Sequence, residues 1–230
     1  LIENNTINNK ELLKAAGKVF ADGNGNSQDI SNTINALAKF GYTKKELNEF
    51  INDRILFGVI KKVFIGNNSQ SISNTLNALA KFGYTKKELN EFINDIILFG
   101  AIEKIFIGNN LQSISNTLNA LAKFCYTKEK FDESINNELL EAAERVFANS
   151  SKPQDISNTL NALAKFGYTK EKLIESNIIN NKALFEAARK VFADKYSNQQ
   201  EIAITLNALA RFDYTKDELN KNINDEILLG

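Results

Sequence analysis

A fifteen-residue segment, SISNTLNALAKFGYT (Ser71–Thr85), occurs five times in this chain with small changes. Its isoleucine recurs at Ile30, Ile72, Ile114, Ile156 and Ile202, so the first three steps are 42 residues and the last is 46. A fixed period of this length is typical of a solenoid, in which each repeat stacks on its neighbours because it cannot bury its apolar faces alone. No other feature of the sequence constrains the fold as strongly.

The repeated segment is predicted to be a helix with a marked end. At about 100° per residue, Ile72, Leu76 and Leu79 fall on one side and form a core-facing stripe. Gly83 then stops the helix, because glycine adopts the left-handed conformation without steric cost. The residues at this stop position are Gly41, Gly83, Cys125, Gly167 and Asp213. We expect the third repeat, with Cys125, to be slightly strained there or to build its stop differently.

A short second helix is predicted after each stop. Three repeats carry the Thr-x-x-Glu spacing of a capping box, in which threonine and glutamate each satisfy a free backbone N–H at the helix start. These pairs are Thr43 with Glu46, Thr85 with Glu88, and Thr215 with Glu218. At Thr127 and Thr169 the acid comes one residue earlier, so the box stays open. The short helix ends near Asn-Asn or Asn-Asp pairs, which favour the start of a new helix.

A third helix is predicted at 54–64, 138–147 and 182–192, although the short and third helices could also merge into one. The phenylalanines of the motif, with the tyrosines two residues later, are expected to pack between repeats. The sequence thus predicts an all-α fold: a right-handed α-solenoid of about five 42-residue repeats, with two long helices and a short one per repeat. The motif helices are expected near 28–40, 70–82, 112–124, 154–166 and 200–212.

The whole chain, 1–230, is predicted to be a single helical-repeat array. Leu1-Ile2-Glu3 aligns with Leu173-Ile174-Glu175, which indicates that the array starts within a repeat. We therefore expect a fragment of a longer array, and a monomer whose truncated repeat edges could make end-to-end contacts.

The side of the motif helix opposite the apolar stripe carries nearly the same polar set in each repeat. In the second repeat Gln70, Asn74, Asn77 and Lys81 fall within about 60° of one another around the helix. We call these positions the polar stripe. Its members, repeat by repeat, are Gln28, Asn32, Asn35 and Lys39; Gln70, Asn74, Asn77 and Lys81; Gln112, Asn116, Asn119 and Lys123; Gln154, Asn158, Asn161 and Lys165; and Gln200, Ile204, Asn207 and Arg211.

The chemistry of this stripe suits a reader of single-stranded RNA. Each asparagine costs about half a kcal/mol of helix propensity relative to alanine, so mere solubility is a weak reason for it. Amide side chains offer donors and acceptors that can pair with base edges, and a lysine can meet one phosphate per repeat. Helical repeats that bind RNA meet about one base each.

The residue that follows each glutamine varies, and we expect discrimination between bases to arise there. These specificity candidates are Asp29, Ser71, Ser113, Asp155 and Glu201. Repeats two and three should then prefer the same base, as should repeats one and four.

Structural interpretations of the same residues stay open. The second asparagine of each repeat could hydrogen-bond a neighbouring repeat to hold register, and the lysines could form a solvated face. The tyrosines after the helix stops could stack on bases, but packing against the next helix is the more ordinary role.

The segment PQDISNTLNALAKFGYT (Pro153–Thr169) resembles the signature helix of octotricopeptide repeat proteins. The likeness covers the motif helix of all five repeats and little of the helices between them. The resemblance implies an α-helical superhelix that binds RNA, in a family that acts mostly in organelle gene expression and post-transcriptional regulation. This chain has a longer repeat, and asparagine stands where the family usually has tryptophan, at Asn35, Asn77, Asn119, Asn161 and Asn207.

The amino-acid composition limits which other functions and locations this chain can have. The chain has no histidine and no recognisable catalytic or phosphate-binding motif, so we expect no enzyme, no cofactor and no metal site. The apolar run 96–102 is too short to cross a bilayer, and a single cysteine permits an intracellular, reducing compartment, with an organelle or a secreted effector left open. Equal numbers of cationic and anionic residues, 28 each, favour the alternative function, a protein-interaction scaffold of HEAT or armadillo type.

Overall fold

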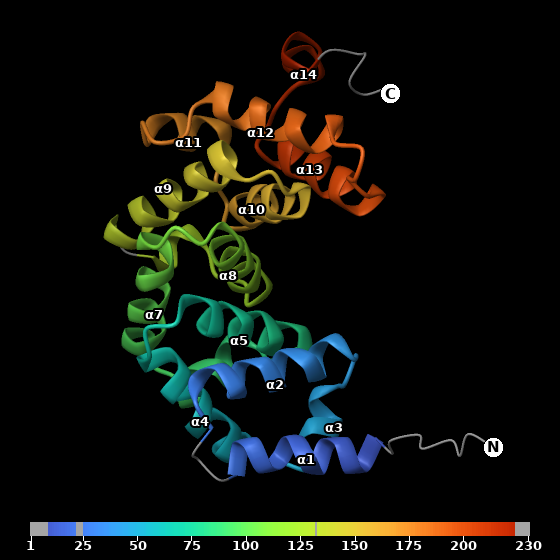
Figure 1. Cartoon of the computed structure of the whole chain (residues 1–230). Coiled ribbons are helices and arrows are strands. Elements are labelled where there is room, and N and C mark those ends of the chain that lie inside the picture. Colours follow the sequence, from blue (N-terminus) through green and yellow to red (C-terminus); the bar gives the residue numbers. More distant parts are fainter. Residues whose placement is uncertain (1–8, 22–24, 132, 224–230) are drawn as a thin grey trace, which may run out of the picture. The chain divides into compact units, whose positions relative to one another are not determined.

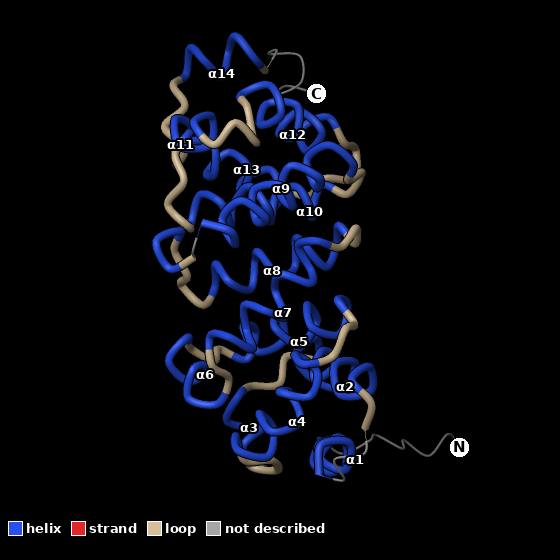
Figure 2. The backbone as a smooth tube through the Cα atoms, turned by 90° about the vertical axis from the view of Figure 1, so that its left-hand side faces the viewer, coloured by secondary structure: helices blue, strands red, loops and turns tan. Residues whose placement is uncertain are grey.

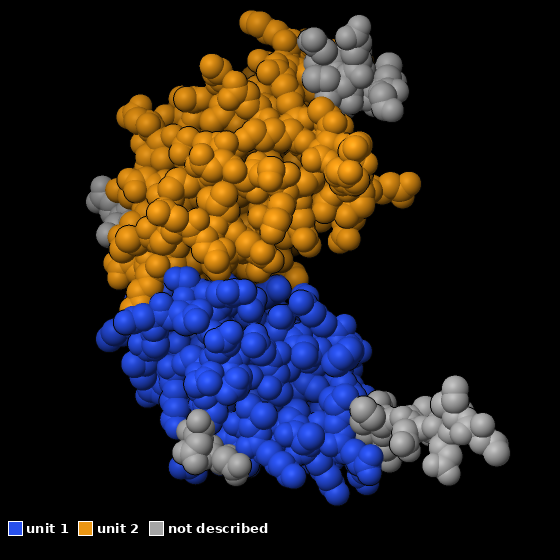
Figure 3. All heavy atoms as spheres, viewed as in Figure 1, with its two compact units in different colours: residues 1–101 blue, residues 102–230 orange. Residues whose placement is uncertain are grey.

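A computed structural model of the chain describes residues 9–21, 25–131 and 133–223. Within these residues every regular element is helical: there are fourteen α-helices and one 3-10 helix (Figures 1 and 2). The predicted all-α class is therefore confirmed. The chain divides into two compact units, residues 1–101 and 102–230 (Figure 3), and each unit is described by itself.

Unit 1 alternates long and short helices as the repeat predicts. Its helices are α1 (Asn9–Ala21), α2 (Ser27–Lys39), α3 (Lys44–Asn48), α4 (Asp53–Ile65), α5 (Ser69–Phe82) and α6 (Lys86–Phe92). The helix α7 (Asp95–Ile107) carries the boundary between the two units. The motif helices are α2 and α5, which pack along each other, and α4 packs against both. By sequence α1 matches a third helix, and it packs on α2 and α4.

Unit 2 continues the same order. Its elements are α8 (Leu111–Lys123), the 3-10 helix η1 (Lys128–Lys130), α9 (Glu133–Asn149), α10 (Pro153–Lys165), α11 (Lys170–Glu175), α12 (Asn181–Ala193), α13 (Gln199–Arg211) and α14 (Lys216–Asn222). The motif helix α10 packs on α8 and on α13, as Figure 1 shows. The third helices α9 and α12 pack on each other and on the motif helices. The short helices stay separate, so the merged alternative is wrong for the described repeats.

Local side chains start the helices where the sequence predicts. Capping boxes form at Thr43, Thr85 and Thr215, and the box stays open at Thr127 and Thr169. Thr127 makes no side-chain cap at all, and the element after it is only a 3-10 helix. Thr169 caps the N–H of Lys172 without a carboxylate at that position, and the α-helix α11 still follows it. An open box therefore does not by itself prevent the short α-helix.

All five motif helices end in the same way. The stop residue has a positive φ in every repeat, including Cys125 (59°) and Asp213 (64°). The tyrosine N–H that follows donates to a carbonyl five residues back, for example Tyr84 to Leu79 at 3.1 Å. Cys125 thus adopts the strained alternative of the two we expected, because a Cβ atom crowds the backbone in this conformation.

The third helix of the third repeat departs from the predicted bounds. It begins at Glu133 rather than near 138, because η1 uses fewer residues than the α-helical turns of the other repeats. Asn136 accepts from a tyrosine hydroxyl as Asp53 and Asn181 do, but those two residues begin α4 and α12, whereas Asn136 lies inside α9. The Nδ2 of Asn136 also donates to the carbonyls of Lys128 (3.2 Å) and Phe131 (3.1 Å), which secures the 3-10 helix.

The apolar stripe forms the core as predicted. Ile72, Leu76 and Leu79 are fully buried, as are their counterparts in α8 and α10. The motif phenylalanines are buried from the second repeat on, and the tyrosines Tyr84, Tyr126, Tyr168 and Tyr214 are buried too. Phe40 is the exception at 71% exposed, since no motif helix covers that face of α2 in the described residues.

Candidate nucleic-acid interface

The outer ends of the polar stripe face solvent in every described repeat. All five glutamines and all five cations of the stripe are exposed. The glutamine lies in the first turn of its motif helix and the cation in the last turn, so each helix presents an amide at one end and a charge at the other. The core-facing residues of the same helices fix this orientation, because they can be buried in only one rotation of the helix.

The first asparagine of each repeat is accessible. Asn32 is exposed, and Asn74, Asn116 and Asn158 are half-buried, as is Ile204 at the same position of α13. None of these four asparagines hydrogen-bonds through its side chain to another described residue. Their amides therefore keep both donors and acceptors for a ligand or for water.

The second asparagine lies deeper, at the seam between motif helices. Asn35, Asn77 and Asn119 are half-buried, and Asn161 on α10 is 8% exposed. Asn207 on α13 is exposed. The Oδ1 atom of Asn77 is buried and accepts no hydrogen bond from a described residue. Burial thus favours a packing role for this position, but no inter-repeat hydrogen-bond ladder forms among the described residues.

Most stripe cations are free of internal partners. Lys39, Lys81, Lys165 and Arg211 make no ion pair or hydrogen bond with the described residues through their side chains. One stripe glutamine does have a partner, since Oε1 of Gln112 accepts from Nζ of Lys152 at 3.3 Å. These four cations can therefore meet an anion without first breaking a contact to the described residues.

The specificity candidates are mostly inaccessible. Ser71 and Ser113 are 2% exposed and Asp155 is 5% exposed. The Asp155 carboxylate accepts from the hydroxyls of Ser115 (3.0 Å) and Ser150 (3.3 Å). Glu201 is half-buried and closes a capping box with Asn198. Only Asp29 has an exposed side chain, so these five positions do not form one accessible row.

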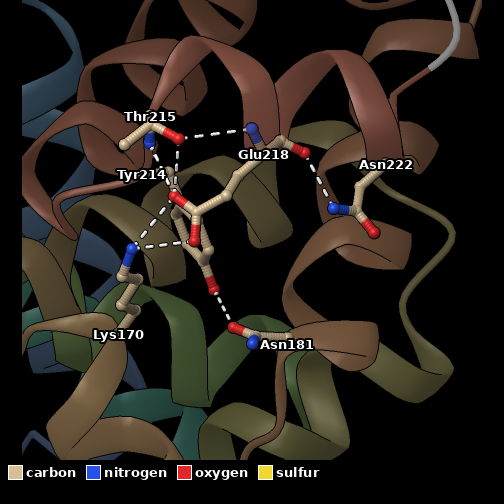
Figure 4. A network of polar contacts seen from close by, with 6 residues as sticks. All are labelled: Lys170, Asn181, Tyr214, Thr215, Glu218 and Asn222. Atoms are coloured by element: carbon tan, nitrogen blue, oxygen red, sulfur yellow. Dashed lines mark hydrogen bonds and ion pairs between the residues drawn. The ribbon is translucent and has the colours of Figure 1, made fainter.

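A second set of polar residues, which the sequence analysis did not single out, joins consecutive repeats (Figure 4). Nζ of Lys170 lies 2.8 Å from Oε1 of Glu218 in the next repeat and 5.4 Å from the ring centre of Tyr214. The Tyr214 hydroxyl donates to Oδ1 of Asn181 at the start of α12. The backbone N–H of Lys170 donates to the carbonyl of Phe212 at 3.1 Å. We call the Lys170–Glu218 contact and its counterparts the inter-repeat ion pair.

The electrostatics of this set follow from its contacts. The hydrogen bond from Lys170, and then that from the Thr215 backbone, lower the pKa of Glu218 to about 2. The hydrogen bond to Glu218 in turn raises the pKa of Lys170. Both groups are thus held in their charged forms across the neutral range.

Unit 1 contains the same arrangement. Lys44 pairs with Glu88 of the next repeat and lies 4.5 Å from the ring centre of Tyr84. The Tyr84 hydroxyl donates to Oδ1 of Asp53 at 2.5 Å. Burial, and then this hydrogen bond to a carboxylate, raise the pKa of Tyr84. The hydrogen bond from Lys44, followed by the Thr85 backbone, lowers the pKa of Glu88 to about 2.

The junction between the third and fourth repeats lacks the ion pair. Lys128 lies where Lys44 and Lys170 lie, but Lys172 takes the place of the glutamate. Burial, and then the like charge of Lys172, lower the pKa of Lys128. The Tyr168 hydroxyl still donates to Oδ1 of Asn136 at 2.6 Å. The inter-repeat ion pair could have been predicted from the Thr-x-x-Glu spacing, because the capping glutamate also accepts from the lysine of the preceding repeat.

These contacts bear on the tyrosines. Because Tyr84, Tyr168 and Tyr214 are buried and hydrogen-bonded between repeats, their rings are not presented for stacking on bases.

A further set of cations also joins repeats. Arg145 donates to the carbonyl of Phe106, and Lys190 donates to those of Phe147 (2.6 Å) and Ala148 (2.8 Å).

The described residues contain no group of three or more acidic or cysteine side chains placed to hold a metal ion. No helix in that same part of the chain is long and apolar enough to span a bilayer. Comparisons with protein-family models, curated proteins and solved structures gave no match to this chain.

Proposed function

We propose that this chain is a right-handed α-solenoid of about five 42-residue repeats, similar to octotricopeptide repeat proteins, and that it binds single-stranded RNA with one repeat per nucleotide. One observation carries the proposal. Four of the five motif helices present the same accessible set, a glutamine, a first asparagine and a lysine, on one face, and α13 differs in having Ile204 and Arg211. Most of these side chains have no partner among the described residues.

In this proposal the glutamine and the first asparagine contact base edges. Both are amides, so each can donate to one group of a base and accept from another. The cation at the last turn contacts a phosphate, which sets the register of the strand on the helices. The second asparagine lies at the seam and supports the packing of the motif helices.

The balanced total charge is compatible with a local basic row. The ammonium groups of Lys44, Lys170 and Lys190 are already engaged in contacts between repeats. The exposed stripe cations, such as Lys81 and Lys165, are left for the ligand. Binding then depends on a few phosphate contacts and should respond to salt in proportion to their number.

Titration of labelled single-stranded RNA at several salt concentrations tests the electrostatic part. The triple variant Lys39→Gln, Lys81→Gln and Lys165→Gln should bind about tenfold more weakly or worse, with a salt slope smaller by about 2, because each phosphate contact to a single strand contributes about 0.7. The matched control removes three exposed lysines of the short helices, Lys45→Gln, Lys87→Gln and Lys130→Gln. An equal loss in both triples would exclude a specific role for the stripe.

The amides are tested separately. Asn74→Ala with Asn116→Ala should lower affinity without changing the salt slope, because the lost contacts are to bases. Asn67→Ala, an exposed asparagine outside the helices, is the control. If the wild-type chain shows no saturable RNA binding, the RNA proposal fails, and the protein-interaction scaffold, which the zero net charge favours, takes its place.

A further inference from the structure

An apolar groove of about 320 Å³ lies in unit 1 between α1 and α2. From α1 it is lined by Leu12, Ala15, Ala16 and Val19. From α2 it is lined by Thr33, Ala36, Leu37 and Phe40. Apart from Leu37, these residues are half-buried or exposed, and Phe40 is 71% exposed.

The same eight residue types recur 172 positions later in the chain. The α1 residues correspond to Leu184, Ala187, Ala188 and Val191 on α12, and the α2 residues to Thr205, Ala208, Leu209 and Phe212 on α13. Every one of these eight counterparts is fully buried, in unit 2, where α10 packs on both α12 and α13. The groove on α1 and α2 is therefore an uncovered copy of the surface that receives α10.

Because α10 packs on the counterparts of α1 and α2, its residues show which kind of helix fits such a groove. The face of α10 that is buried includes Ile156, Leu160, Asn161 and Ala164. The same residue types stand on α13, 46 positions later, as Ile202, Leu206, Asn207 and Ala210. There they are open: Leu206 is 41% exposed, Asn207 and Ala210 are exposed, and Ile202 is half-buried. Within the described residues, the chain thus carries both an uncovered groove and an uncovered helix of the type that fills it.

We propose that α13 of one copy of this chain occupies the α1–α2 groove of a second copy, so that the chains associate head to tail. The contact repeats the one that α10 makes with α12 and α13 within unit 2. Because two different surfaces meet, each added copy leaves a new groove and a new helix uncovered. Such heterologous association does not stop at a dimer unless the geometry closes a ring. This inference does not depend on RNA binding.

Sedimentation velocity over a range of protein concentrations, without RNA, tests the proposal. The sedimentation coefficient of the wild-type chain should rise with concentration. Leu206→Glu blocks the helix and Phe40→Glu blocks the groove, and each should weaken self-association at least about tenfold. Both positions are exposed, so the substitutions should leave thermal unfolding nearly unchanged. The control Ile96→Glu removes an apolar residue that is 83% exposed outside both surfaces, and should associate like the wild type.

A mixture of the two blocked variants gives the decisive result. Phe40→Glu retains an open α13, and Leu206→Glu retains an open groove, so the mixture should form a one-to-one dimer and nothing larger. A wild-type chain that stays monomeric up to about 1 mM would overturn the proposal. So would self-association that the two variants leave unchanged, or a mixture that stays monomeric.

Discussion

Lys170 and Glu218 lie 48 residues apart in the chain, and their side chains form an ion pair of 2.8 Å between Nζ and Oε1. The glutamate also accepts from the N–H and the hydroxyl of Thr215 at the start of α14. One carboxylate therefore starts a helix and joins it to the preceding repeat. Lys44 and Glu88 do the same in unit 1, whereas Lys128 meets Lys172 instead.

The substitution Lys172→Glu should stabilise the chain. It replaces a like-charge contact with an ion pair to Lys128 and closes a capping box with Thr169, with an expected gain of about 1 kcal/mol. The gain should shrink at high salt, and thermal unfolding at two salt concentrations measures both effects. Lys45→Glu is the control. It adds a carboxylate in the first turn of α3, where the only expected gain is a favourable interaction with the helix dipole. A stability equal to that of the control would contradict the prediction.

Cys125→Gly should also stabilise the chain, by about 1 kcal/mol, because Cys125 holds a left-handed φ of 59° that glycine adopts freely. Gly83→Ala should cost a similar amount. A Cβ atom at Gly83 would meet no atom within 4 Å, so the cost is conformational and not steric. Gly58→Ala should instead raise the free energy of unfolding. Gly58 lies inside a helix with open space around it, and alanine is the better helix former there. Chemical denaturation measures all three, and a loss of stability in Cys125→Gly would refute the argument.

Acid should destabilise the chain through Glu88 and Glu218. Their pKa in the folded chain is about 2, against an ordinary value of 4.5, so the unfolded chain binds more protons between these pH values. The contribution of these carboxylates is therefore complete above about pH 4.5 and is lost as the pH falls toward 2. Glu88→Gln with Glu218→Gln should flatten the pH dependence of the melting temperature over this range. Glu91→Gln, an exposed glutamate of α6, should leave the curve as it is.

Tyr168→Phe should lower the free energy of unfolding by about 1 kcal/mol, because the Tyr168 hydroxyl donates to Asn136 at 2.6 Å. Asn136 also donates to the carbonyls of Lys128 and Phe131, so the variant should loosen the 3-10 helix next to it. Urea unfolding should show a lower midpoint with an unchanged slope. Tyr196→Phe is the control, since Tyr196 is 78% exposed. Equal midpoints for the two variants would rule out a structural role for the Tyr168 hydroxyl.

The helices were predictable because their signals are local. A capping threonine, a glutamate three residues later and a glycine stop act within one or two turns of the chain, so they give the bounds of α2, α3, α5 and α6 closely. The early start of α9 was not predictable, since it follows from the failure of a short α-helix at Thr127 and from the new hydrogen bonds of Asn136.

The candidate site was only partly predictable, because periodicity gives the face of a helix but not its neighbours. The glutamines and cations of the polar stripe are exposed as expected, while Ser71, Ser113 and Asp155 are buried on the same helices. The sequence favoured packing over base stacking for the tyrosines, and the structure adds that the hydroxyls of Tyr84 and Tyr168 donate to the preceding repeat.

The sequence by itself determined the repeat, the all-α class and the starts and stops of most helices, since these depend on contacts within a few residues. Tertiary structure decided which polar side chains stay accessible, which join repeats, and that α1 and α2 present an uncovered groove. The physical reason is that burial and ion pairing arise between residues about 40 positions apart in the chain, where the packing of one helix on another sets which groups meet.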